Sequence, residues 1–271
     1  MFLYYKRVYR KGKDKGDCES HMGEPFLFDK PLKEGIIQKR NSRFTMDVML
    51  NGEIVACHCP TTGRIGDIEL KQVACLISEN DNPKRKLRHT VEAISCDNLE
   101  CEHKNWIGIN QILSNKLVGF FLDTHQLNEI VQDYSCIKRE TKLGVSKLDF
   151  LVGNTYIEVK TALTTLEVKY GSHIRTHPVT PFSSTERFVK HINELAGSLE
   201  NHERVILLTV QQYEVTNPKQ RQRSTHYQEV KATIERAVKK GVESWNLTMN
   251  FTPTGVMLHT CENTTRKIYQ D

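Results

Sequence analysis

The chain has few of the features of membrane, secreted or disulfide-bonded proteins. In its 271 residues, no uninterrupted apolar run approaches the roughly 20 residues that span a bilayer. The first residues, Met-Phe-Leu-Tyr-Tyr-Lys-Arg, lack the apolar core of a signal peptide. Without a secretion signal, the eight cysteines are not expected to form disulfides. These absences favour a protein of the cytoplasm, or of the nucleus in a eukaryote, that does not act at a membrane.

The sequence also lacks an overall excess of one charge. The formal net charge is +5, but residues 1–16 alone hold six basic residues and one acidic residue. The rest of the chain carries equal numbers of both signs, so any nucleic-acid surface must be a local patch. We expect residues 1–25 to be a basic and flexible extension, which could touch phosphate or serve only as a solubilising tail.

The composition and the predicted secondary structure indicate two domains of modest size. A hydrophobic fraction of 38% with 26% charged residues is ordinary for a globular chain of this length. Residues 36–109 read as about five short strands, including two around Asn51-Gly52, the strongest short hairpin signal. This predicts an OB-like small β-barrel over residues 26–109.

From residue 110 onwards the pattern changes to mixed helices and strands. Apolar spacing predicts helices near 110–123, 185–199 and 227–240, with Ser183 and Glu186 as a capping box on the second. Residues 205–210 are continuously apolar, as in a central strand covered on both faces. We therefore predict a second α/β domain over 110–271, with a mixed central sheet and the element order of restriction-endonuclease-like domains.

The most informative stretch lies between Lys147 and Lys160. Two β-prone runs flank Gly153-Asn154, a two-residue hairpin signal. With that turn, Asp149 lies opposite Glu158, and Glu158 shares a face with Lys160. Facing carboxylates repel unless they are neutralised, and hard oxygen ligands suit Mg²⁺ or Mn²⁺. The alternative is a solvated strand face with loose ion pairs.

Several separated blocks of the sequence carry a further signal. The stretches at 39–47 and 58–64 resemble the opening Arg-Tyr-Lys-Arg-Phe-x-x-Asp block and the His-Cys-Pro-Asn-Thr-Gly-Arg signature of the sugar fermentation stimulation protein family. Further matching blocks are Asn82-Pro83-Lys84-Arg85-Lys86, Asn115-Lys116-Leu117, Leu148-Asp149-Phe150-Leu151, Tyr156-Ile157-Glu158-Val159-Lys160 and Thr185-Glu186-Arg187 with Lys190-His191.

This resemblance implies an N-terminal OB-type domain joined to a PD-(D/E)xK nuclease domain. The implied activity is metal-dependent hydrolysis of phosphodiester bonds in DNA or RNA. Carried over by position, Asp149 and Glu158 become metal ligands for Mg²⁺ or Mn²⁺, and Lys160 becomes the catalytic lysine. A metal between the carboxylates would activate a water and neutralise charge on the phosphate. Many nucleases of this fold pair into homodimers, and the oligomeric state is left open here.

Four further residues are candidates for the catalytic site. Glu140 lies on the preceding predicted strand and could add a carboxylate, or it could lie on the surface. Arg187 and His191 lie four residues apart on the helix that Glu186 opens, from which they could reach the phosphate. Alternatively, Arg187 pairs with a neighbouring glutamate on the helix surface.

The candidates for nucleic-acid binding lie in the first domain. Arg40, Arg43 and Phe44 combine cations with an aromatic ring, a mixture that grips a phosphate backbone and stacks a base. Arg64 could bind a phosphate, or it could belong to a tight turn. The other three candidates form a dense basic run that could equally be a solvated loop: Lys84, Arg85 and Lys86.

The sequence departs from the family pattern at Thr61, which replaces an asparagine, and at Phe188, which replaces a glycine. Two classes of function therefore stay open. The first is a metal-dependent nuclease, which the intact Asp149, Glu158 and Lys160 favour. The second is a non-catalytic DNA-binding regulator that uses the nuclease fold as a docking platform.

Overall fold

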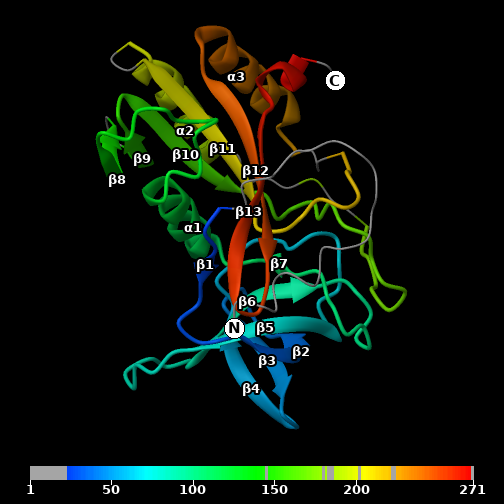
Figure 1. Cartoon of the computed structure of the whole chain (residues 1–271). Coiled ribbons are helices and arrows are strands. Elements are labelled where there is room, and N and C mark those ends of the chain that lie inside the picture. Colours follow the sequence, from blue (N-terminus) through cyan, green and yellow to red (C-terminus); the bar gives the residue numbers. More distant parts are fainter. Residues whose placement is uncertain are drawn as a thin grey trace, which may run out of the picture.

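The computed structural model describes residues 23–143, 146–178, 181, 186–200, 203–220 and 224–269. These residues form a small barrel and a larger mixed sheet (Figure 1). The barrel lies at the lower end of the view, and the larger sheet rises above it with its helices. Within the described ranges, no helix is both long and apolar enough to cross a membrane.

The first half of the chain forms the barrel. Its sheet order is β4-β3-β2-β5-β6-β7, and an additional parallel pairing of β4 with β6 closes five of these strands into a barrel. The predicted strands are confirmed, including the hairpin at Asn51-Gly52, where both residues have positive φ (51° and 87°). The strands are β2 (Lys33–Arg40), β3 (Thr45–Leu50), β4 (Glu53–His58), β5 (Val73–Glu79), β6 (His89–Ser95) and β7 (Ile107–Gly108).

The barrel core is completed by a segment from the second half of the chain. Leu163, Leu166 and Val168, together with Tyr213, pack in one buried cluster with barrel residues such as Ile37. Tyr213 is 1% exposed and its hydroxyl accepts a hydrogen bond from the backbone N–H of Glu167, at 3.2 Å. The two parts of the molecule therefore share one hydrophobic cluster.

The larger sheet has seven strands in the order β1-β13-β12-β11-β10-β9-β8. β11 is parallel to both β10 and β12 and lies at the centre, as its continuous apolar run predicted. β1, at the start of the predicted barrel region, pairs instead with β13 of this sheet. The strands are β1 (Phe26–Leu27), β8 (Ile137–Leu143), β9 (Ser146–Val152), β10 (Thr155–Thr161), β11 (Arg204–Gln211), β12 (Glu243–Phe251) and β13 (Gly255–Asn263).

Helices cover both faces of the larger sheet. On one face, α1 (Gln111–Asp123) packs in the cluster that contains Ile157 and Leu208. On the other face, α2 (Glu186–Ser198) and α3 (Tyr227–Lys240) pack over Tyr156 and Leu207. A short 3₁₀ helix, η1 (Thr265–Tyr269), follows β13.

The helix ends follow the sequence signals. The side chain of Asn110 caps α1 by accepting from the backbone N–H of Ile112, at 3.0 Å, and of Leu113. Gly241 ends α3 at φ 113°, as predicted. Ser183 of the predicted capping box lies outside the described residues. The predicted architecture, an N-terminal small barrel followed by an α/β domain with a mixed sheet, is confirmed.

Candidate functional site

The site begins at the hairpin of β9 and β10. Gly153 has φ 53°, and Val152 pairs with Thr155, so the predicted two-residue turn is confirmed. The strand pairing continues to Phe150 and Ile157 and then stops. One step further, the register places Asp149 opposite Glu158, as predicted. Beyond the end of the strand pairing, the Asp149 carboxylate accepts a hydrogen bond from the backbone N–H of Val159, at 2.8 Å.

Glu158 is the most buried carboxylate of the site, with 2% of its surface exposed. One oxygen, Oε1, contacts the Lys160 ammonium and lies 2.9 Å from Nδ1 of His191 on α2. The other oxygen, Oε2, is buried, and none of the described residues donates a hydrogen bond to it. A buried carboxylate oxygen without a donor is costly, so Oε2 of Glu158 is a candidate position for a ligand.

Asp149 is partly buried beside Glu158. Its Oδ1 accepts a hydrogen bond from Nδ2 of Asn115 on α1, at 2.6 Å. Burial, and then the negative charge of Glu158, raise the pKa of Asp149 above its ordinary value. The hydrogen bonds from Val159 and Asn115 and the charge of Lys160 oppose this rise without cancelling it. The pair is therefore electrostatically strained in the absence of a further cation.

Lys160 and His191 form the more open side of the site. The Lys160 side chain is one-third exposed, while that of His191 is 12% exposed. Nζ of Lys160 lies 3.4 Å from Nδ1 of His191, so both side chains surround the same oxygen of Glu158. Ile157 and Val159 pack into the core on the α1 side, which confirms the predicted alternation of faces.

The residues fit a divalent metal that keeps open coordination positions. Within the part of the chain that the structure describes, no group of three or more His, Cys, Asp or Glu side chains could hold a metal. Two carboxylates are nevertheless a common protein contribution to a Mg²⁺ site, where waters and substrate phosphate complete the shell. The unpartnered Oε2 of Glu158 and the strained Asp149 are suitable first ligands.

The remaining catalytic candidates separate into near and far positions. His191 joins the site, whereas Glu186 is exposed at the first turn of α2. The side chain of Arg187 lies outside the described part of the structure. Glu140 is exposed on β8 and has a positive φ of 50°. It stands opposite Asp149 at the one position where the pairing of β8 with β9 is interrupted.

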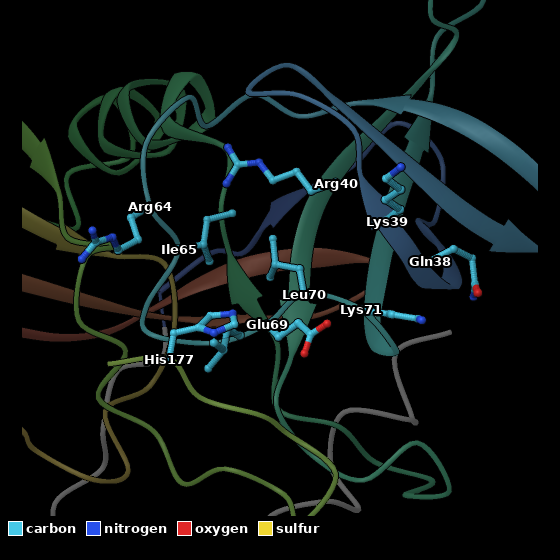
Figure 2. A pocket seen from close by; sticks show the side chains of 10 residues that line it. Gln38, Lys39, Arg40, Arg64, Ile65, Glu69, Leu70, Lys71 and His177 are labelled. Atoms are coloured by element: carbon cyan, nitrogen blue, oxygen red, sulfur yellow. The ribbon is translucent and has the colours of Figure 1, made fainter. Parts of the chain in front are cut away.

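The nucleic-acid candidates fall into three places on the barrel. The Arg40 guanidinium donates to the backbone oxygens of Thr61 (2.6 Å) and Gly63 (3.1 Å), and it lines a cavity together with Arg64 (Figure 2). Arg43 and Phe44 are exposed in the β2–β3 turn, with Phe44 at 55%. The predicted basic run of Lys84, Arg85 and Lys86 is exposed on the β5–β6 loop.

The sequence did not reveal the role of Asn115. Asn115 stands 34 residues before Asp149, and only the packing of α1 against β10 brings the two side chains together. An amide within a helix carries no signal of its own, because exposed asparagines are common in helices. The matching Asn-Lys-Leu block was the one hint that this position has a function.

Comparisons with known proteins bear on the fold and the family. A model described as "SfsA N-terminal OB domain" matches residues 39–109, and one described as "Sugar fermentation stimulation protein RE domain" matches residues 112–255. The chain belongs to the sugar fermentation stimulation protein family. Its barrel is the OB domain of that family, as predicted.

Curated relatives carry the name "Sugar fermentation stimulation protein homolog". The protein of Pseudoalteromonas atlantica is 34% identical over 82% of this chain and 96% of its own length. That of Shewanella frigidimarina is 33% identical over 85% of this chain and 96% of its own. A solved structure, "The structure of Pyrococcus Furiosus SfsA in complex with Ca2+", matches with a TM-score of 0.66 at 20% identity. It covers 88% of this chain and 97% of that chain, and it shows the same fold.

Proposed function

We propose that this protein is a metal-dependent phosphodiesterase that cuts DNA or RNA while its OB domain grips the nucleic acid. The observation that carries the proposal is the pair of Asp149 and Glu158. Glu158 is buried with one oxygen lacking a donor among the described residues, and burial together with the charge of Glu158 raises the pKa of the adjacent Asp149. Two adjacent carboxylates of like charge destabilise the fold when they are buried. A protein that only binds nucleic acid has no need of such a pair.

Asp149 and Glu158 would hold Mg²⁺ or Mn²⁺, which would activate a water and neutralise the phosphate when bound. Asn115 and the N–H of Val159 hold the Asp149 carboxylate in place. Lys160 is partly exposed next to Glu158, so its ammonium is available to stabilise negative charge on the phosphate. His191 fixes Oε1 of Glu158, which leaves Oε2 to face the ligand.

The relative from Pyrococcus furiosus supports a cation site in this family, because its structure is described as a complex with Ca²⁺. Ca²⁺ and Mg²⁺ are both hard cations that take oxygen ligands. Asp149 and Glu158 offer this type of ligand, and their combined charge favours a divalent cation over a monovalent one.

Cleavage assays with labelled single- and double-stranded DNA and RNA test the proposal. Each substrate is incubated with Mg²⁺, Mn²⁺ or EDTA and with wild type, Asp149→Ala or Lys160→Ala. Lys267→Ala is the matched control, since Lys267 forms an exposed ion pair with Glu262 on another part of the surface. We expect metal-dependent cutting by wild type and the control alone. Binding without cutting in all four proteins would instead indicate a nucleic-acid-binding regulator.

A further inference from the structure

A cavity on the barrel surface is separate from the carboxylate pair. It has a volume of about 300 Å³ and is lined by side chains from the end of β2, from the segment 64–71 and from His177 (Figure 2). In this view Arg40 and Arg64 lie on one side of the cavity and Lys39 and Lys71 on the other.

The cavity is built jointly by the OB domain and the second domain. His177 belongs to the segment that follows β10, and that segment is held against the barrel by backbone hydrogen bonds. The N–H of His177 donates to the oxygen of Asp67 at 2.7 Å, and the N–H of Glu69 donates to the oxygen of Arg175 at 2.8 Å. The hydroxyl of Tyr170 also donates to Asp67, at 2.7 Å. The wall is thus fixed before any ligand arrives.

The chemistry of the lining suits a nucleotide. Ile65, Ile68 and Leu70 are each at least 92% buried and form an apolar floor. Of the described residues that line the cavity, four are Lys or Arg, and Glu69 is the one carboxylate. The Arg40 guanidinium donates to three backbone oxygens, so little side-chain entropy remains to be lost on binding.

The same segment links the cavity to the carboxylate site. The N–H of Gly66, two residues after Arg64, donates to the oxygen of Leu163 at 2.7 Å. Leu163 follows Lys160 by three residues, and the side chain of Leu166 packs closely on Gly66. The segment that lines the cavity is therefore held directly against the segment that leaves the candidate catalytic strand.

We propose that this cavity binds one nucleotide of a single nucleic-acid strand, with phosphates on Lys39, Arg40, Arg64 and Lys71 and the sugar or base on the apolar floor. The proposal rests on the proposed function for the identity of the ligand as nucleic acid. It extends that function by placing a binding site for the nucleic-acid strand at the interface between the two domains.

Binding of fluorescein-labelled single-stranded 12-residue DNA and RNA tests the proposal. Fluorescence anisotropy is measured in EDTA, so that no cutting occurs, at several NaCl concentrations. The variant Lys39→Gln/Lys71→Gln removes two cavity charges that are exposed, which leaves the fold intact. The matched control Lys239→Gln/Lys240→Gln removes the same charge from the exposed last turn of α3, which carries no nucleic-acid candidate.

We expect the cavity variant to bind about tenfold more weakly and the control to change by less than about twofold. The slope of log Kd against log salt should fall by about 0.7 for each lost phosphate contact in the cavity variant. Glu69→Gln should tighten binding because it removes the one repelling carboxylate. Equal losses in the cavity variant and the control would overturn the proposal.

Two further results separate this proposal from the catalytic one. Wild type that cuts nucleic acid while the cavity variant binds as well as wild type would overturn the cavity and leave the nuclease standing. Wild type that never cuts while the cavity variant loses binding would support the cavity and contradict the nuclease. Labelled nucleoside monophosphate that binds as tightly as the 12-residue strands would show a site for free nucleotides and also overturn the proposal.

Discussion

Two carboxylate sites in the same sheet, each at least partly buried, differ in how their charge is compensated. Glu243 on β12 accepts two hydrogen bonds from the Arg204 guanidinium and one from Nε1 of Trp245, all at 2.8 Å. Burial alone would raise the pKa of Glu243, but these donors hold it below its ordinary value. At the other site, burial and Glu158 together raise the pKa of Asp149.

This difference separates a carboxylate that stabilises the fold, Glu243, from carboxylates that are candidates for a catalytic role, Asp149 and Glu158. The sheet can satisfy a partly buried acid, because both oxygens of Glu243 have donors. Arg204 also donates to the backbone oxygen of Ile130, at 2.6 Å, and so ties β11 to the segment between α1 and β8. Asp149 and Glu158 each have fewer donors than Glu243, and one oxygen of Glu158 has none among the described residues. Perturbed acids of this kind are typical of functional sites.

The largest expected effect is the loss of cutting in Asp149→Ala. Removing one of the two proposed metal ligands should lower the cleavage rate by on the order of 10³-fold, because transition-state charge would no longer be neutralised. Single-turnover cleavage in Mn²⁺ measures this effect. Arg204→Ala should cut at the wild-type rate per folded molecule, and a comparable loss in both variants would contradict the separation of the two sites.

The second effect is on stability. Arg204→Ala leaves Glu243 partly buried without its fork of donors, and it should lower the free energy of unfolding by about 2 kcal/mol. Urea denaturation followed by circular dichroism measures the change. Arg204→Lys is the matched control and should restore only part of the loss, because an ammonium cannot make both hydrogen bonds in one plane. Unchanged stability in Arg204→Ala would show that this pair contributes nothing to the fold.

A third, smaller effect concerns Asn115, which donates a hydrogen bond to the Asp149 carboxylate. Asn115→Ala should lower the cleavage rate by about tenfold, because residues that orient metal ligands typically contribute this much. The metal concentration at half-maximal rate should rise, a change that a purely structural role would not produce. Asn115→Asp should be worse than Asn115→Ala, since a third negative charge would repel Asp149.

The smallest effect is the pH dependence of metal binding. Since the folded pKa of Asp149 is raised, its proton is favoured at low pH, and its contribution to the stability of the metal-free protein is lost as pH rises through that pKa. Metal binding requires the deprotonated acid. The rise in Tm caused by Mn²⁺, about 2–4 °C per kcal/mol, should therefore shrink as pH falls from 8 towards the Asp149 pKa. A rise in Tm that stays constant over this range would contradict the raised pKa.

Local signals in the sequence predicted much of the fold. The turns at Asn51-Gly52 and Gly153-Asn154 and the cap at Gly241 each require positive φ, which few residues supply, so their positions could be predicted from residue type. The apolar run of β11 and the stripes of α1 and α3 follow from burial periodicity. The facing pair of Asp149 and Glu158 followed directly from the two-residue turn.

Contacts between distant segments could not be predicted in the same way. The pairing of β1 with β13 joins a two-residue strand to a strand far along the chain, and a strand this short has no periodicity that could mark it. The segment that holds Leu163 and Leu166 has no regular secondary structure, yet it completes the barrel core. For the same reason Asn115, Lys71 and His177 gained their roles only from the tertiary structure.

The most direct test of the account is a titration of metal-free protein with Mn²⁺, followed by calorimetry and by electron paramagnetic resonance. Wild type should bind Mn²⁺ at the pair of Asp149 and Glu158, and Glu158→Gln and Asp149→Asn should lose this binding, while Glu243→Gln keeps it. Equal Mn²⁺ binding in all four proteins, or none in wild type, would contradict the claim that this incompletely satisfied carboxylate pair binds a metal.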